Sequence, residues 1–152
     1  MDVFQALKKI YLFSEVPDAV LKQVAETAEE MTFRPGEKIV SESQTGDTLY
    51  VVRNGSVRGS KGGEATTFVV GPGGSFGQMA LLDGGPVGMD AVAVERVDLL
   101  AIRASRLREK FAGDHEAAHY LFRAVAKSLA ARLRRAVDAA VLAREASGAA
   151  RP

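Results

Sequence analysis

The stretch GPGGSFGQMALLDGGPVGMDAVA (residues 71–93) decides how the rest of the chain is interpreted. Gly73, Gly74 and Gly77 surround Phe76 and permit a tight backbone bend there. The next residues, Gln78–Leu82, have the composition of a single helical turn. The start of a short helix in a glycine-rich bend presents free N–H groups, which is typical of an anion site.

The region around this stretch is typical of β-structure. Residues 32–103 contain 13 of the 15 glycines of the chain, and their apolar residues come in short runs separated by turn signals. Asn54-Gly55 and Gly62-Gly63 are typical hairpin turns, because both dipeptides tolerate positive φ. We expect strands at 38–40, 49–52, 56–58, 66–70, 91–94 and 97–102. Such a series of short strands predicts a mainly β, antiparallel roll or jelly roll.

Helical patterns flank the β-region on both sides. Residues 1–31 repeat apolar side chains at helical spacing, and the pair Glu29-Glu30 falls on a surface helix in this interpretation. Residues 105–147 predict C-terminal helices, with Asp114 as the N-cap of a long one. We therefore expect a single domain at 1–147 and a disordered tail at 148–152.

The long helix carries an apolar stripe at a spacing of four residues: Leu121, Val125, Leu129, Leu133, Val137 and Val141. A helix of more than thirty residues exceeds the body of so small a domain, so part of the stripe needs another surface to cover it. We expect a homodimer through the helix around 114–147.

Composition excludes several classes of protein. The chain has 152 residues, a net charge of +1 and no cysteine, so disulfides, cysteine-ligated metals and a cysteine nucleophile are absent. It has no apolar run of transmembrane length and no signal-peptide pattern, so we expect a cytoplasmic protein with no membrane partner. Basic residues are in excess after residue 103, which leaves nucleic-acid binding through the arginine-rich helix as an alternative that the near-neutral total charge disfavours.

His115-Glu116-Ala117-Ala118-His119 matches the H-E-x-x-H pattern of zinc hydrolases. A zinc site needs a third protein ligand, and the nearest acidic residues that follow on this helix, Asp138 and Glu145, lie many turns away. We therefore interpret the motif as a solvated helix start and expect no metal site, no catalytic residues and no enzyme.

The stretch at 71–93 resembles the phosphate-binding cassette of cyclic nucleotide-binding domains, the regulatory domains of Crp/Fnr-like proteins and of cyclic-nucleotide-gated channels and kinases. The resemblance extends to residues 34–39, 46–55 and 99–102 and to the start of the long helix at 124–135. It implies a β-roll with flanking helices. The transcription factors of this family carry a winged helix-turn-helix domain after the long helix. We do not expect that domain here, because the sequence stops at Pro152.

Mapped onto this sequence, the cassette positions are Phe76, Gly77, Gln78, Met79, Ala80, Leu81, Val87 and Gly88. The family has glutamate for the ribose hydroxyl where this chain has Gln78, and arginine for the cyclic phosphate where it has Val87. Gly88 replaces an often hydroxyl-bearing residue, and Asp90 would repel phosphate if it faced the pocket. The base-contacting region would correspond to Arg135-Ala136-Val137, which offers no hydroxyl.

These departures predict a signal-transduction module with a degenerate cassette, which works through an unidentified protein partner and binds no cofactor. Binding of cAMP or cGMP is disfavoured. The alternative is a genuine cyclic-nucleotide receptor in which Arg53, Arg58, Lys61 or an arginine of the basic segment 103–152 substitutes for the missing one.

Overall fold

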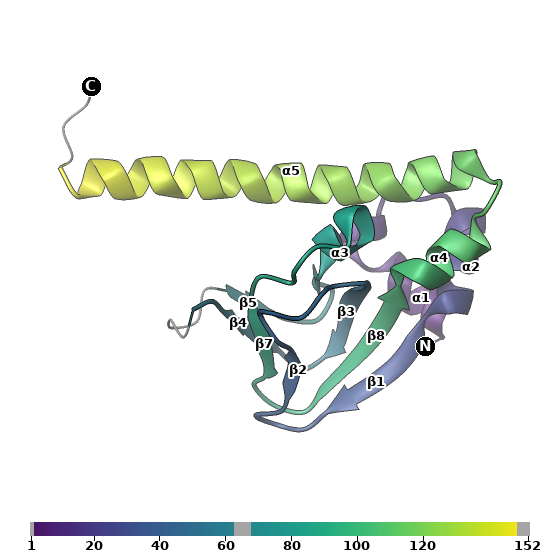
Figure 1. Cartoon of the computed structure of the whole chain (residues 1–152), viewed down its shortest axis with the longest axis horizontal. Coiled ribbons are helices and arrows are strands. Elements are labelled where there is room, and N and C mark those ends of the chain that lie inside the picture. The colour runs from purple at the N-terminus through teal and green to yellow at the C-terminus, as the bar shows by residue number, and fades with distance from the viewer. Residues whose placement is uncertain (1, 63–67, 149–152) are drawn as a thin grey trace.

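Two four-stranded antiparallel sheets face one another below a long helix (Figure 1). This is a computed structural model, and it describes residues 2–62 and 68–148. The first sheet has the order β1 (Glu29–Phe33), β8 (Val97–Arg103), β3 (Thr48–Asn54) and β6 (Ser75–Phe76). The second has the order β2 (Lys38–Val40), β7 (Asp90–Ala93), β4 (Val57–Ser60) and β5 (Phe68–Val70). The predicted antiparallel β-roll with flanking helices is confirmed.

The helices gather at one end of the roll and along one side of it. These are α1 (Val3–Lys8), the 3-10 helix η1 (Tyr11–Phe13), α2 (Asp18–Thr27), α3 (Gln78–Asp83), α4 (Ala104–Lys110) and α5 (His115–Ala146). α5 starts beside α4, passes over α3 and continues beyond the sheets (Figure 1). Asp114 is its N-cap as predicted, because Oδ1 accepts a hydrogen bond of 3.1 Å from the Ala117 amide.

Strand β8 separates two hydrophobic clusters. Val97 and Leu99 face the second sheet in the inter-sheet cluster, while Leu100 and Ile102 face α1, α2 and α5 in the helical cluster. Because both faces of β8 are covered, its sequence is almost continuously apolar instead of alternating. The helical cluster thereby fixes α5 to the same sheet that contributes β3 and β6 to the cavity described below.

The boundary expected at residue 31 between helices and β-roll is wrong. α2 ends at Thr27, and Glu29–Met31 belong to β1, where Glu29 pairs with Ala101 and Met31 with Leu99. The charged pair Glu29-Glu30 obscured the strand pattern in the sequence, because both carboxylates are solvent-accessible and form ion pairs. Glu30 forms an ion pair of 2.6 Å with Arg53, and Glu29 one of 3.1 Å with Arg106.

The Asn54-Gly55 turn is not a hairpin turn between paired strands. β3 and β4, which it connects, lie in different sheets, so the turn passes the chain from one sheet to the other. β4 and β5 do pair, with Arg58 opposite Val69. Gly63 and the start of the expected strand at Thr66-Thr67 lie outside the described residues, as does the expected tail except for Gly148.

Candidate functional site

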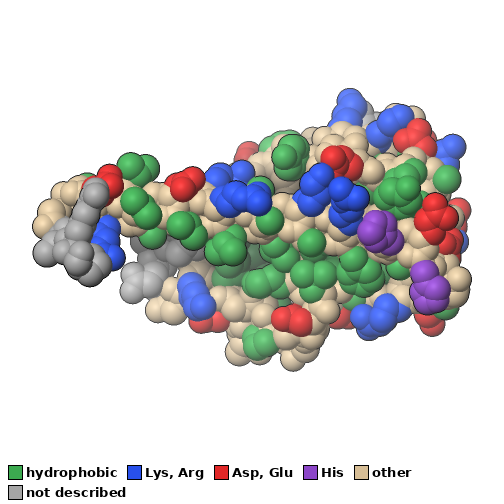
Figure 2. Space-filling view, turned by 90° about the horizontal axis from the view of Figure 1, so that it is seen from above, with side chains coloured by type: hydrophobic (Ala, Val, Ile, Leu, Met, Phe, Trp, Pro, Cys, Tyr) green, Lys and Arg blue, Asp and Glu red, His purple; other side chains and the backbone are tan. Residues whose placement is uncertain are grey.

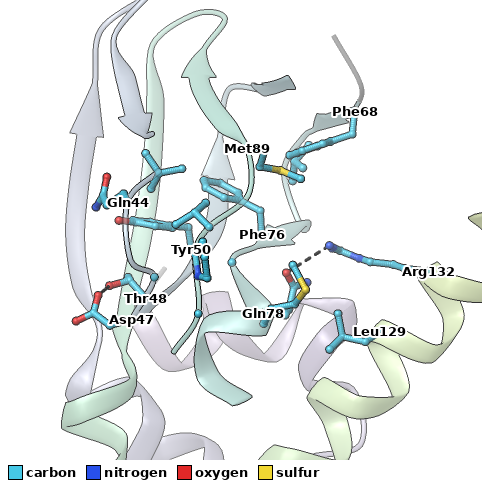
Figure 3. A pocket seen from close by; sticks show the side chains of 18 of the residues that line it. Gln44, Asp47, Thr48, Tyr50, Phe68, Phe76, Gln78, Met89, Leu129 and Arg132 are labelled. Carbon is cyan, nitrogen blue, oxygen red and sulfur yellow. Dashed lines mark hydrogen bonds between the residues drawn. The ribbon is translucent and has the colours of Figure 1, made fainter. Parts of the chain in front are cut away.

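A cavity of about 740 Å³ opens between the two sheets, α3 and the middle of α5 (Figure 3). Its walls come from the β2–β3 loop, from β3, β5 and β6, from the loop after α3, and from one face of α5. The volume lies within the usual range for small-molecule sites. The lining residues used below are Gln44, Asp47, Thr48, Tyr50, Val70, Phe76, Gln78, Met79, Val87, Met89, Leu129, Arg132 and Arg135.

The glycine before α3 is required by the close approach of two chain segments. Gly77 has φ +86°, and a Cβ placed on it would lie 2.5 Å from the carbonyl oxygen of Thr48. Only glycine fits both the left-handed backbone and this contact. The helical turn expected at 78–82 is confirmed as α3, and the glycine anchors it against β3 beside the cavity.

Gln78 belongs to a polar cluster that connects the cassette with α5. Its side chain is only 2% exposed, and Nε2 donates a hydrogen bond of 2.7 Å to Oγ of Ser75. Arg132 of α5 donates from Nη1 to Oε1 of Gln78 (3.3 Å) and from Nη2 to the Ser75 carbonyl oxygen (2.7 Å) (Figure 3). Burial lowers the pKa of the Arg132 guanidinium, and the nearby charge of Arg135 lowers it further.

Val87 lies in the cavity wall, where it packs against the inter-sheet cluster. Its loop is fixed by backbone hydrogen bonds, from the Val87 amide to the Gln44 carbonyl (2.9 Å) and from the Gly46 amide to the Gly85 carbonyl (2.9 Å). This wall therefore presents an apolar side chain where the family resemblance implies an arginine.

The other predicted cassette residues do not all reach the cavity. Phe76 does, and its ring stacks on Tyr50 with centroids 5.0 Å apart; Met79 also lines it. Leu81 instead packs against the helical cluster and borders a second, apolar hollow between α4 and α5, outside the lining of the first cavity. Ala80 lies within α3, and Gly88 lies outside the lining, with its amide bonded to the Glu42 carbonyl (3.1 Å).

Of the substitute cations considered from the sequence, Arg53 points elsewhere, to Glu30, and Arg58 and Lys61 are exposed and outside the cavity lining. Arg132 does line the cavity. Asp90 does not, because its carboxylate accepts a hydrogen bond from the Glu42 amide (2.7 Å) and pairs with Lys38 (3.5 Å).

The sequence by itself did not specify which arginine of the basic segment 103–152 would reach the cavity, although a signal existed. Arg132 follows the buried Val125 by seven residues, so it continues the helix face that rests on the roll. Tyr50, Thr48 and Leu129 were not predicted as site residues, since they come from two elements, β3 and α5, that only the fold brings together.

His115, Glu116 and His119 are exposed at the start of α5. Across residues 2–62 and 68–148, no cluster of three or more side chains that could ligate a metal occurs. Nor does any helix in the described part of the chain combine the length and apolarity needed to cross a bilayer.

The outer side of α5 carries an uncovered apolar surface, here called the α5 stripe: Phe122, Leu133, Val137 and Val141. Each of these side chains is about half exposed or more. Hydrophobic side chains continue along the helix toward its C-terminal end in Figure 2, with Lys and Arg beside them. Alanines at 126, 130 and 140 fall between the large residues on the same side.

Comparison with known proteins gives a consistent result. The model of the family described as "Cyclic nucleotide-binding domain" matches residues 30–114. A CRP-like cAMP-activated global transcriptional regulator of Mycobacterium tuberculosis is 26% identical over 129 residues, which cover 82% of this chain and 58% of that protein. The chain thus spans less than two thirds of the length of this relative.

Two solved structures are similar over most of the chain. The N-terminal domain of a transcriptional regulator from Streptomyces coelicolor has a TM-score of 0.73 at 32% identity, covering 88% of this chain and 94% of that one. The catabolite activator protein of Thermus thermophilus has a TM-score of 0.71 at 32% identity, covering 88% of this chain and 63% of that one.

Proposed function

Because the chain belongs to the cyclic nucleotide-binding domain family, we propose that it is a non-enzymatic regulatory module whose cassette does not bind cAMP or cGMP in the usual way. Val87 carries this proposal. It stands where the resemblance implies the phosphate-binding arginine, and it is packed into the cavity wall.

The energetic argument concerns the phosphate. A hydrogen bond from a guanidinium to an anion contributes about 1.5–3 kcal/mol, and a valine supplies neither the charge nor the donors. The loop around Val87 (residues 84–89) contains no arginine and is held by backbone hydrogen bonds to residues 42–46, so the loop itself supplies no substitute cation. The anion would therefore lose affinity on the cassette side of the cavity.

Signal transmission would depend on the contact between α5 and the cassette. Arg132 ties the helix to Ser75 and Gln78, which are the first residues of β6 and of α3. A ligand that binds Arg132 in place of Ser75 and Gln78 changes the free energy of this position of α5 relative to other positions of the helix. Occupancy of the cavity would thereby alter the surface that α5 offers to a partner.

The first partner that we propose is a second copy of the chain, paired through the α5 stripe. Large apolar residues with intervening alanines allow two helices to approach closely, and an uncovered apolar surface of this kind marks an interaction site. Further protein partners would recognise the position of the two paired α5 helices.

Calorimetric titration with cAMP and cGMP tests the proposal, with the double variant Gln78→Glu, Val87→Arg as the informative comparison. We expect no binding heat for the unmodified chain, and binding of at least one nucleotide by the double variant, because the variant restores both missing cassette groups. Binding at micromolar affinity by the unmodified chain would contradict the proposal.

Arg132 favours a second candidate, a cyclic-nucleotide receptor in which the α5 side of the cavity supplies the cation. This candidate predicts micromolar nucleotide binding that Arg132→Met weakens by at least about tenfold, whereas Arg134→Met on the outer side of α5 leaves it unchanged. Absence of binding in the unmodified chain would contradict it.

A further inference from the structure

We propose that the cavity binds an apolar monocarboxylate of the medium-chain fatty acid type, with the carboxylate held by Arg132 and Arg135 and the chain lying between the two sheets. This inference rests on the proposed function, because it names a ligand for a cavity that no longer holds a cyclic phosphate on its cassette side.

The walls between the sheets are apolar. Val70 and Met89 line the cavity, and the stacked rings of Tyr50 and Phe76 form its centre (Figure 3). Burial raises the pKa of the Tyr50 hydroxyl, which further favours its neutral form. A surface of this composition favours a ligand with an apolar body.

The polar end lies on α5. Arg132 and Arg135 are three residues apart, hence neighbours on one helix face, and both line the cavity. The structure gives no ion pair between either guanidinium and an acidic side chain of the described residues, and Arg132 bonds only to the neutral oxygens of Ser75 and Gln78. Two adjacent cations without a carboxylate create a site for an anion, and a carboxylate matches a guanidinium in geometry.

The remaining charge in the wall fixes the orientation of the ligand. Asp47 lines the cavity from the β2–β3 loop, on the opposite side from Arg132 in Figure 3, and accepts a hydrogen bond of 2.7 Å from the Thr48 hydroxyl. A carboxylate avoids this side and approaches α5.

On the cassette side of the cavity, the polar groups of a nucleotide find few partners. Gln78 is buried, and its amide is already bonded to Ser75 and Arg132, so it is not free for a ribose hydroxyl. A purine and a ribose would bury several donors and acceptors against valine, methionine and phenylalanine, which disfavours them relative to an alkyl chain.

Titration calorimetry of the full chain with hexanoate, octanoate and decanoate, with decanol as the neutral control, tests the inference. We expect one decanoate per chain, binding about tenfold or more tighter than decanol, because only the carboxylate engages the arginines. Affinity should rise roughly fourfold for each added methylene, since each one transfers apolar surface from water.

Three variants locate the carboxylate. Arg132→Met and Arg135→Met should each weaken decanoate binding by about tenfold while leaving decanol unchanged. Arg134→Met removes the same charge from the outer side of α5 and should have no effect. Circular dichroism of each variant verifies that α5 remains helical.

Equal affinity for decanoate and decanol, or unchanged decanoate binding in both pocket variants, would overturn the inference, because either result indicates adsorption without a carboxylate site. Absence of decanoate binding would also overturn it, and would leave the proposed function standing. Micromolar binding of cAMP or cGMP would overturn the proposed function itself, whatever the result with decanoate.

Discussion

The first and second halves of α5 carry the same apolar pattern at a spacing of four residues, but in opposite environments. Leu121 and Val125 are 9% and 2% exposed against η1, α2 and the first sheet, whereas Leu133 and Val137 are 65% and 52% exposed. Consecutive residues of the apolar stripe are four apart, and four residues turn the helix by about 400°, so each step rotates the stripe by about 40°. From Leu121 to Val141 the stripe therefore passes from the face on the roll to the outer face. The comparison teaches that one sequence pattern packs on the roll in its first half and leaves an uncovered apolar surface in its second.

The largest expected effect is in the first half. Leu121→Ala should lower the free energy of unfolding by about 2–4 kcal/mol, because it leaves a void beside the helical cluster. Urea denaturation at a concentration where the protein is monomeric measures it. Leu133→Ala is the matched variant and should change the value by less than about 0.5 kcal/mol under the same conditions. Equal losses in the two variants would mean that the second half also packs on its own roll.

The second half should determine association. Leu133→Asp should raise the dimer dissociation constant by at least about tenfold, since a charge buried in an apolar interface is strongly unfavourable. Sedimentation equilibrium measures the constant. Leu142→Asp is the control: both leucines are 65% exposed, but nine residues place them on opposite sides of the helix. A dimer that tolerates Leu133→Asp but not Leu142→Asp would contradict pairing through the α5 stripe.

The start of the first half depends on its cap. Asp114→Ala should reduce the free energy of unfolding by about 1 kcal/mol, because the Ala117 amide loses its acceptor. Asp138→Ala, in the exposed second half, should leave the stability unchanged or raise it slightly, since alanine is the better helix former. Thermal denaturation of both variants, monitored by circular dichroism, measures the difference.

The smallest effect concerns the ion pair between Lys127 and Glu15, which ties the first half to the loop after η1. The hydrogen bond and charge of Lys127 hold the pKa of the Glu15 carboxyl below its ordinary value of 4.5. A lowered folded-state pKa means that the pair stabilises the fold above pH 4.5 and that this contribution disappears as the pH falls through the lowered value.

An NMR titration of the Glu15 carboxyl carbon measures this shift. In Lys127→Met, the midpoint should return toward 4.5, and high salt should reduce the shift in the unmodified chain. An ordinary midpoint in the unmodified chain would mean that the pair does not form in solution.

Local sequence determined most of the secondary structure. The glycine-rich bend before α3, the N-cap of α5 and the strands from β2 to β8 other than β6 follow from turn chemistry and periodicity, which act within a few residues. Strand β1 could not be predicted in this way. Its first two residues are glutamates, which form ion pairs with Arg53 and Arg106 and obscure the apolar alternation in Glu29–Phe33. Likewise, the destination of the Asn54-Gly55 turn depends on which strands pair, and no local signal records this.

The sequence also determined which side chains stand at the proposed cassette positions, among them Gln78 and Val87. Only the tertiary structure decided which residues from distant segments, such as Arg132, line the cavity. Arg132 lies 54 residues from Gln78 in the sequence, and the two meet because the helical cluster fixes the first half of α5 on the roll. A side chain's environment depends on distant segments that pack around it, so the hydrogen bonds of Arg132 to Ser75 and Gln78 arise only when the chain has folded.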